Sequence, residues 1–382
     1  MLGHIAHNQV SVAPEHTRMV LDGHKLPWHM DRVEAWERGE RIAPITIDMA
    51  LTRKCNFSCG FCYAMLQGNA ESVITREIME GFLVDSARMG ILGISLVSDG
   101  ESTLSDAYVF TIQRGHELGM SMASGTNALT LIPGRSDQVL PYLDYLRVNF
   151  SAGQPDRYAK IMGCKPAHYH KVVANIRHMV EFKRRHSLPV TLGIQMVLMP
   201  QDGDQILPFA RLGLDLGVDY AIIKHCSDDE HGSLGIQYDK YRDLYPLLQE
   251  AEALSTDSYK CVVKWSKIQD EGKRSYQRCY GPPFLIQISG SGLVAPCGML
   301  FNERYAKFHI GNICEERWWD IWQSERYWEV MAYLGSPNFN AQRMCGTLCL
   351  QNYINTALDR HQRGIEHIEP GVGGKPLHVN FV

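Results

Sequence analysis

The feature that most constrains the fold is a regular alternation of strand-like and helix-like segments between residues 45 and 235. Six short runs, most of them rich in Ile, Val and Leu, recur there, as expected for strands that are buried on both faces. These runs are Ile45–Leu51, Gly93–Val97, Ser121–Ser124, Leu146–Phe150, Val190–Leu198 and Tyr220–Lys224. Amphipathic helical patterns lie between them, at Thr75–Met89, His170–His186 and Gln205–Leu216.

Six successive βα units predict parallel strands joined by right-handed crossovers. Such a chain folds either into a partial barrel of the TIM type or into a doubly wound sheet. In both folds the loops that leave the C-terminal ends of the strands carry the chemistry. After Cys226 the alternation stops, and Asp228–Gly235 is a polar linker that precedes a predicted hairpin at Phe284–Pro296. We therefore place a domain boundary near residue 235.

This boundary divides the chain into four predicted parts. Residues 1–44 form an N-terminal extension with one helical stretch, from Met30 to Arg38. Residues 45–235 form the α/β barrel, and residues 236–355 form a smaller α+β domain that contains the hairpin. The glycine-containing tail, residues 356–382, is predicted to be a loose strap or a cover over part of the barrel mouth.

Charge and hydropathy exclude several classes of protein. The formal net charge is −4, so no basic surface of the kind that binds nucleic-acid backbone is expected. Apolar runs such as Gly90–Ile94 are too short to span a bilayer, which argues against a membrane partner. Residues 1–17 lack the apolar block of a signal peptide. These features predict a soluble, cytoplasmic protein.

The chain contains 11 cysteines, an odd number that argues against a disulfide framework in a protein with no export signal. Seven of them fall into two groups with the spacing of metal ligands. The first group, Cys55, Cys59 and Cys62, directly follows the first predicted strand. Three thiolates on one tight loop can bind three corners of a cubane iron–sulfur cluster and leave the fourth iron open for catalysis. Zinc or an inert core is the alternative, but zinc sites usually recruit four ligands.

This loop resembles the signature of the radical S-adenosylmethionine (SAM) superfamily, Cys-x3-Cys-x-aromatic-Cys, with Phe61 as the aromatic residue. The resemblance implies a partial (β/α)6 barrel and a [4Fe–4S] cluster that binds SAM through its open iron. The family has a Gly-Gly-Glu-Pro stretch after the second strand, and here the equivalent is Asp99–Ser102. The resemblance implies that Gly100 and Glu101 bind the amino group of SAM.

Further cofactor contacts follow from the same resemblance. Ser151, after the fourth predicted strand, matches a family serine that contacts SAM, and Gln195 on the fifth can reach the ribose. Phe61 is expected to pack near the adenine, with help from Tyr63. The alternative for these polar residues is ordinary polarity at a barrel mouth.

The second cysteine group combines Cys279 and Cys297, which bracket the predicted hairpin, with Cys345 and Cys349. Four thiolates suit either structural zinc or an iron–sulfur cluster. The arrangement resembles the twitch form of the SPASM extension of radical SAM enzymes, as does Ile310–Ile313 followed by a Trp-rich segment. The resemblance implies one auxiliary [4Fe–4S] cluster that is fully ligated by protein, in an iron–sulfur domain of α+β type.

The cofactors implied by the resemblance generate a 5′-deoxyadenosyl radical, which removes hydrogen from unactivated C–H bonds. An auxiliary cluster that accepts an electron from the substrate radical gives oxidation, whereas a thiol that returns hydrogen gives epimerisation. Cys226, after the sixth strand, is the candidate thiol, although a buried and inert cysteine is the plainer interpretation. Lys224 and His225 are candidate substrate contacts, and a structural histidine is again the alternative.

The leading interpretation is oxidation or epimerisation of a small polar metabolite, such as a sugar, an aminocyclitol or a nucleotide-linked compound. The chain lacks the extra N-terminal domain, of about eighty residues, that many peptide-modifying members carry. Leu26–Val33 also resembles members that accompany sugar-modifying genes. The alternatives are peptide crosslinking or epimerisation, modification of a nucleoside or nucleic-acid base, and, in another class, a non-catalytic iron–sulfur carrier. An electron donor such as flavodoxin or ferredoxin is the expected protein partner.

Overall fold

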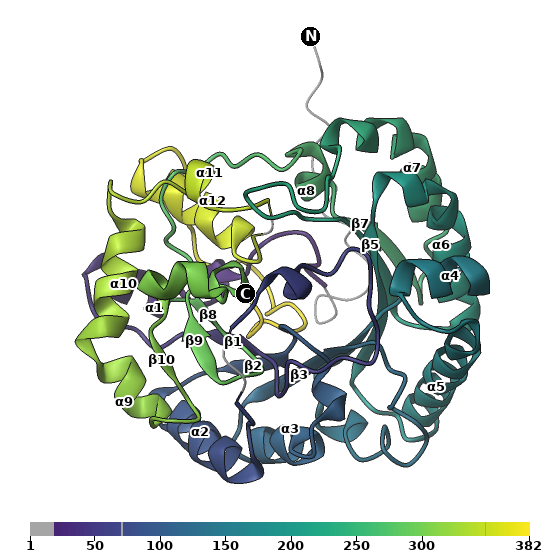
Figure 1. Cartoon of the computed structure of the whole chain (residues 1–382), viewed down its shortest axis with the longest axis horizontal. Helices are drawn as coiled ribbons and strands as arrows, with labels where there is room; N and C mark the ends of the chain where they lie inside the picture. Colours follow the sequence, from purple (N-terminus) through teal and green to yellow (C-terminus); the bar gives the residue numbers. More distant parts are fainter. Residues whose placement is uncertain (1–18, 70–71, 348) are drawn as a thin grey trace.

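The computed structural model describes residues 19–69, 72–347 and 349–382. In this part of the chain the strands form one sheet in the order β10-β9-β8-β1-β2-β3-β4-β5-β6-β7, which curves around a central space (Figure 1). The barrel strands are β1 (Thr46–Met49), β2 (Gly93–Leu96), β3 (Ser121–Thr126), β4 (Tyr145–Asn149), β5 (Thr191–Leu198), β6 (Tyr220–His225) and β7 (Lys260–Val263). The remaining strands are β8 (Leu285–Ile288), β9 (Leu293–Ala295) and β10 (Gly311–Asn312).

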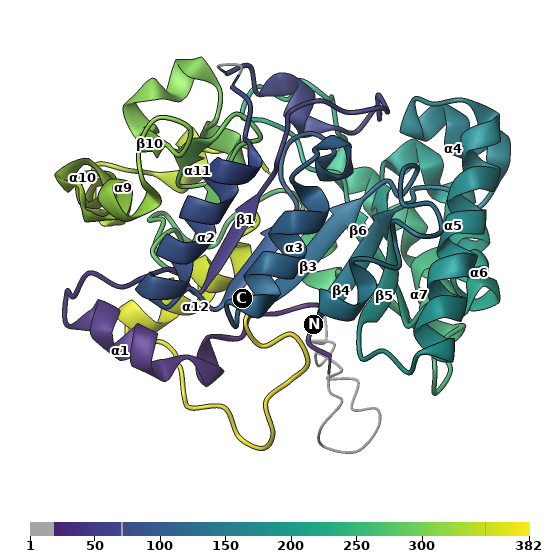
Figure 2. The same ribbon diagram turned by 90° about the horizontal axis from the view of Figure 1, so that it is seen from below.

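Helices cover the outside of the curved sheet (Figures 1 and 2). The helices of the barrel are α2 (Arg76–Met89), α3 (Tyr108–Glu117), α4 (Pro155–Met162), α5 (Pro166–Arg185), α6 (Ile206–Leu216), α7 (Tyr245–Ala253) and α8 (Trp265–Gln269). The others are α1 (Met30–Glu37), α9 (Trp318–Gln323), α10 (Glu325–Gly335), α11 (Ala341–Met344) and α12 (Asn352–Gln362). No helix within the described residues is both long enough and apolar enough to span a membrane.

Strands β1 to β7 follow one another in sequence order and pair in parallel, which is the topology of a partial barrel. A doubly wound sheet would instead reverse its strand order at a switch point. The predicted partial (β/α)6 barrel is therefore confirmed, and each of the six predicted strands is present to within three residues. The sequence patterns missed β7, a short strand that lies beyond the predicted domain boundary, where the regular alternation has stopped.

The sheet continues across the predicted boundary at residue 235. On one edge β7 pairs with β6, and on the other edge β8 pairs in parallel with β1 before turning back into β9. The predicted hairpin is thus confirmed, and it extends the barrel sheet. The division into domains at that residue stays a prediction.

Strand β4 shows that the inside of the barrel is hollow. Its buried residues, Leu146 and Val148, alternate with the partly exposed Tyr145, Arg147 and Asn149. The first set packs in the core with the surrounding helices, whereas the second set lines an internal cavity. A strand that is apolar on both faces was the expectation; the polar inner face exists because the barrel encloses polar space instead of a packed core.

The described ends of the chain, residues 19–29 and 377–382, close the barrel at the end opposite to the mouth (Figure 2). The Thr46 hydroxyl, at the start of β1, donates to the carbonyl of Asn380 at 2.7 Å. The buried ammonium of Lys25 donates to the carbonyls of His378, at 2.8 Å, and of Phe381, at 2.6 Å. The tail therefore forms a floor beneath the N-terminal ends of the strands, and the predicted cover over the mouth was wrong. The predicted lack of a signal peptide concerns residues outside the described ranges.

We predict that Lys25→Met loosens this floor, because it leaves two buried carbonyls without a donor while keeping the length of the side chain. Hydrogen exchange of the amides of residues 377–382 should become faster by roughly tenfold or more, equivalent to about 1.4 kcal/mol. Lys375→Met, at an exposed position of the same tail, is the matched control. Unchanged exchange in Lys25→Met would contradict the role given to this ammonium.

Candidate functional site

A cavity of about 540 Å³ occupies the inside of the barrel. It extends from the loop that carries the first cysteine group to the floor formed by the termini. Most of the predicted site residues line it, namely Cys55, Cys59, Phe61, Cys62, Tyr63, Gly100, Glu101, Gln195, Lys224 and His225. Ser151 and Cys226 are the members of the predicted barrel site that do not belong to its wall.

Two glycines hold the start of the first cysteine loop. A side chain on Gly100 would lie 2.1 Å from the carbonyl oxygen of Thr52, and one on Gly290 would lie 2.2 Å from the Thr52 carbonyl carbon. Gly100 also has a φ of 83°, which other residues rarely adopt. The Thr52–Arg53 backbone therefore passes between the loop after β2 and the β8–β9 turn, at a distance that only glycine permits.

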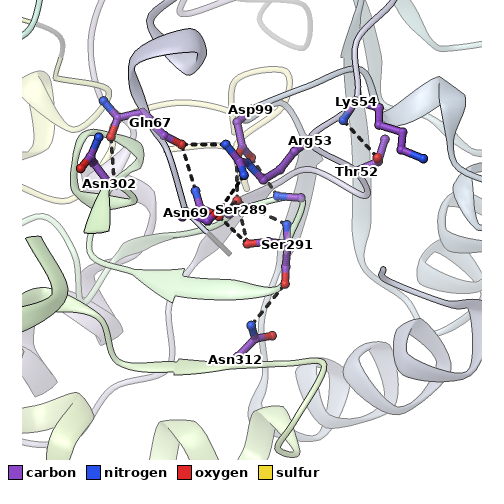
Figure 3. Close-up of polar contacts among 11 residues, drawn as sticks. Thr52, Arg53, Lys54, Gln67, Asn69, Asp99, Ser289, Ser291, Asn302 and Asn312 are labelled. Carbon is purple, nitrogen blue, oxygen red and sulfur yellow. Dashed lines mark hydrogen bonds and ion pairs between the residues drawn. The ribbon is translucent and has the colours of Figure 1, made fainter. Parts of the chain in front are cut away.

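Asp99 joins the same three segments through polar contacts (Figure 3). Its carboxylate accepts hydrogen bonds from the Ser289 hydroxyl, at 2.6 Å, and from the Gly290 amide, at 2.8 Å. Arg53 lies 3.5 Å from the carboxylate and donates to the carbonyls of Gln67, at 2.9 Å, and Asn69, at 2.6 Å. Asp99 stands where the family has a glycine, and its carboxylate links the cysteine loop to the β8–β9 hairpin.

The far side of the cysteine loop rests on the end of α4. The amide of Ser58 donates to the Gly163 carbonyl at 3.3 Å, and the amide of Gly60 donates to the Ile161 carbonyl at 3.1 Å. Gly163 has a φ of 58°, and a side chain there would lie 2.0 Å from the Ser58 oxygen. The loop is therefore supported from both sides.

The three thiols of this loop fit a cluster with an open iron. Each lines the cavity, so a group that they bind presents a face to the cavity. Burial and then the neighbouring Cys62 raise the pKa of Cys59, which places these thiols close together. Among the described residues, no three His, Cys, Asp or Glu side chains converge as one metal ion requires. A cubane cluster can use more widely spaced thiolates, because each thiolate binds a different iron.

Glu101 is buried and firmly held. Its Oε1 accepts hydrogen bonds from the hydroxyls of Thr103, at 2.6 Å, and Thr126, at 2.7 Å, while Oε2 accepts one from the Asn127 amide at 2.7 Å. A carboxylate oxygen can accept two hydrogen bonds, so Oε2 retains the capacity to accept one from an ammonium group. This arrangement fits the role implied for Glu101, whose assignment stays a prediction.

Gln195 and Ser151 lie in different environments. Gln195 lines the cavity and donates to the Asn149 side chain at 2.9 Å. Ser151 is fully buried and accepts a hydrogen bond from the Val197 amide at 3.2 Å. Asn149 also lines the cavity, and the sequence analysis missed it although it lies two residues before Ser151.

Of the three candidates around the end of β6, Lys224 and His225 line the cavity and Cys226 does not. Cys226 is fully buried, and its sulfur lies 4.0 Å from the carbonyl of Phe61. Burial raises the pKa of Cys226 to about 12, so its sulfur keeps its hydrogen near neutral pH. Lys224 does face the cavity, and burial followed by the charge of Arg147 lowers its pKa to about 7.

The four cysteines of the second group gather as predicted, next to the barrel. Burial followed by the charges of the other three thiols raises the pKa of Cys279, so the four groups are neighbours. Tyr276 donates to the sulfur of Cys349 at 3.1 Å. Asn355 on α12 lies 3.6 Å from the sulfur of Cys279 and 3.9 Å from that of Cys349. Polar donors around four thiols fit an iron–sulfur cluster, whose sulfurs accept such hydrogen bonds.

Tyr63 lies between the two cysteine groups. A side chain on Gly298, beside Cys297, would lie 3.0 Å from the Tyr63 hydroxyl. Burial, then Asp99, Cys62 and Cys297, raise the pKa of Tyr63 above its usual range. Tyr63 therefore connects the cavity wall, to which it belongs, with the second cysteine group.

Sequence reasoning missed several ionisable residues of the wall, among them Asp48, Arg147, Lys264 and Lys267. Burial raises the pKa of Asp48 to about 7, and the Gln287 side chain donates to it at 3.4 Å. Asp48 in β1 and Arg147 in β4 could have been found from the sequence, because each is a single ionisable residue inside an apolar strand. Lys264 and Lys267 flank α8 and carried no such signal.

Comparisons with known proteins agree with this arrangement. Residues 49–212 match the model of the radical SAM superfamily, and residues 279–349 match that of the SPASM iron–sulfur cluster-binding domain. A cofactor-modifying protein for the tungsten-containing aldehyde ferredoxin oxidoreductase of Pyrococcus furiosus is 19% identical over 295 residues, which are 73% of this chain and 81% of that protein.

Two solved structures share the fold. SuiB of Streptococcus suis, bound to SAM, is 16% identical with a TM-score of 0.60, over 79% of this chain and 71% of SuiB. The native structure of anSMEcpe with bound SAM is 12% identical with a TM-score of 0.53, over 85% of this chain and 98% of that one. At these identities the likeness concerns the fold.

The two matched domains assign a catalytic [4Fe–4S] cluster, SAM and an auxiliary cluster to this chain, and both cysteine groups face or adjoin one barrel cavity. On these grounds the chain is an enzyme of the radical S-adenosylmethionine superfamily, with a C-terminal iron–sulfur domain of the SPASM type.

Proposed function

We propose that this enzyme oxidises a C–H bond of a small polar metabolite, such as an alcohol carbon of a sugar-like or nucleotide-linked compound. The observation that carries the proposal is the barrel cavity, which has the first cysteine group at its mouth, ionisable side chains in its wall and a closed floor. Its lining residues supply both cofactor contacts and substrate contacts.

Named residues would hold each cofactor. Cys55, Cys59 and Cys62 hold the catalytic cluster, and Cys279, Cys297, Cys345 and Cys349 hold the auxiliary one. Gly100, Glu101 and Gln195 bind SAM, with Phe61 beside the adenine. When bound and reduced by a donor such as flavodoxin or ferredoxin, the catalytic cluster and SAM supply a 5′-deoxyadenosyl radical that abstracts hydrogen.

Oxidation is favoured over epimerisation because residues next to the auxiliary site line the cavity, whereas the candidate thiol does not. Epimerisation needs a hydrogen donor beside the substrate, but the buried Cys226 is not among the residues that line the cavity. On the other side, Leu350 and Tyr353, which follow the ligand Cys349, do line the cavity. The auxiliary site therefore lies where it can accept one electron from a substrate radical.

Oxidation of an alcohol to a carbonyl removes a hydrogen atom, a proton and an electron. The proton needs a base with a pKa near the working pH. Asp48 in the wall fits this role, because burial raises its pKa to about 7, so a large part of it is ionised at that pH.

The closed floor supports a small substrate over a long one. Because the termini close the barrel below, a substrate enters and leaves through the mouth. An extended peptide would place most of its length outside the cavity, away from the ionisable wall. SuiB was solved with its precursor peptide SuiA, and that is a property of SuiB.

We expect anoxically reconstituted protein to release 5′-deoxyadenosine and methionine from SAM when dithionite is added. Cys59→Ala should lower this release by at least a hundredfold, because the remaining two thiols cannot hold the cluster. Liquid chromatography of both products provides the measurement. Cys314→Ser, outside both cysteine groups, is the control that should retain release. Full activity of Cys59→Ala would overturn the assignment of the catalytic loop.

The auxiliary site has its own test. Wild-type protein should contain about eight irons per chain, as two cubane clusters require, and Cys345→Ala should contain about four. Iron and zinc are counted by plasma emission spectrometry, and Mössbauer spectra identify the remaining cluster. Cys314→Ser should keep the wild-type iron content. One zinc per wild-type chain, lost in Cys345→Ala, would show that the second group is a structural zinc site.

A further inference from the structure

Four cationic side chains converge on one side of the barrel cavity. Arg147 comes from β4, Lys224 from β6, and Lys264 and Lys267 from the segment around α8, and all four line the cavity. We call this group the basic pocket. Its members lie close enough for their charges to interact, since Arg147 and Lys267 both lower the pKa of Lys224 after burial. Burial and then Lys267 likewise lower the pKa of Lys264.

The positive charge of the basic pocket is not neutralised by the protein. None of its four members forms an ion pair with a described residue. Lys264 and Lys267 instead lie 5.8 and 5.5 Å from the centre of the Tyr353 ring, and Lys267 donates to the Cys349 carbonyl at 3.2 Å.

Three carboxylates lie near the basic pocket, namely Asp48, Asp22 and Asp270. Asp48 is only partly ionised near neutral pH, because burial raises its pKa to about 7. Asp22 is held by the Ser266 hydroxyl, at 3.0 Å, and by the Tyr353 hydroxyl. Lys224 is partly neutral at the same pH, and an anion bound beside it would favour its protonated form.

Unused hydrogen-bonding groups also point to a ligand. His225 is only 5% exposed and lines the cavity next to Lys224, yet its Nδ1 has no hydrogen-bond partner among the described residues. The Nε of Arg147 is buried and equally without a partner there. Buried polar atoms of this kind are rare in folded proteins unless something else binds them.

We propose that the basic pocket binds a phosphoryl group of the substrate, so that the enzyme acts on a phosphate ester or a diphosphate-linked metabolite. This inference rests on the proposed function, because it names the class of substrate for the same cavity. A phosphoryl group carries about −1.5 to −2 charges and several acceptor oxygens. It therefore offsets the excess charge of four cations better than a single carboxylate does, and it can accept hydrogen bonds from both Lys and Arg.

The position of the pocket also orients such a substrate. Lys224 and Arg147 reach the cavity from barrel strands, whereas Lys267 contacts Cys349 of the second cysteine group. A phosphoryl group held here leaves the rest of the substrate in the same cavity as the first cysteine group. The phosphoryl group is thus an anchor, and it takes no part in bond breaking.

Inorganic phosphate is a suitable probe, because it needs no knowledge of the rest of the substrate. Calorimetric titration is done on wild-type protein with both clusters and saturating SAM. We expect saturable binding that weakens at least tenfold, or about 1.4 kcal/mol, in Lys224→Met and in Lys264→Met. Both changes keep side-chain length and remove the charge. Lys240→Met removes the same charge from an exposed position and should leave the affinity unchanged.

The outcomes of the phosphate titration distinguish an anchor for the substrate from other roles of the basic pocket. Iron content near the wild-type value shows that a variant is folded, and if one variant fails this check the other decides. Equal phosphate affinity in the wild type and a folded variant would overturn the proposal, as would tighter binding of malonate, a dicarboxylate, than of phosphate. Loss of wild-type phosphate binding on addition of SAM would assign the cations to the cofactor instead. Release of 5′-deoxyadenosine by the same wild-type sample tests the proposed function separately.

Discussion

The close approach of the Thr52–Arg53 backbone to Gly100 and Gly290 is the contact on which the rest of the site depends. It brings together the start of the cysteine loop, the loop after β2 and the β8–β9 turn, which are far apart in the sequence. No side chain larger than hydrogen fits at either glycine, so the geometry allows little variation. Asp99 and Arg53 then add a partly buried ion pair and hydrogen bonds across the same junction. One junction thereby sets the positions of the first cysteine group, the Gly-Glu pair that we propose binds SAM, and the hairpin that leads to the second cysteine group.

The second determinant of the site is that the barrel is hollow and closed below. In most parallel barrels the inward side chains pack against one another, whereas here the inward positions of β4 and β6 carry Arg147 and Lys224. Such side chains can be buried only if a ligand or a partner offsets the loss of hydration. The floor, held by Lys25 and Thr46, keeps this polar space separate from the surface. Together these features give the cavity the charge that the proposed substrate must match.

The sequence predicted the barrel well because its evidence is local. Strand runs, helical periods and the hairpin turn are encoded by neighbouring residues, and each of the six predicted strands was confirmed. The short strand β7 and the basic pocket were missed for the opposite reason. Arg147, Lys224 and Lys264 are separated by dozens of residues, and only the closing of the sheet brings them together. Cys226 illustrates the same limit: its place after β6 suggested the cavity, but its buried side chain does not belong to the cavity wall.

The sequence by itself therefore determined the superfamily, the cofactors and the βα order, because short cysteine spacings and periodic apolar patterns need no knowledge of distant contacts. The tertiary structure alone decided which side chains face the cavity, where the tail lies and how buried charges combine. These properties depend on the direction of each side chain relative to a closed sheet. They also depend on the dielectric surroundings that only the folded chain creates.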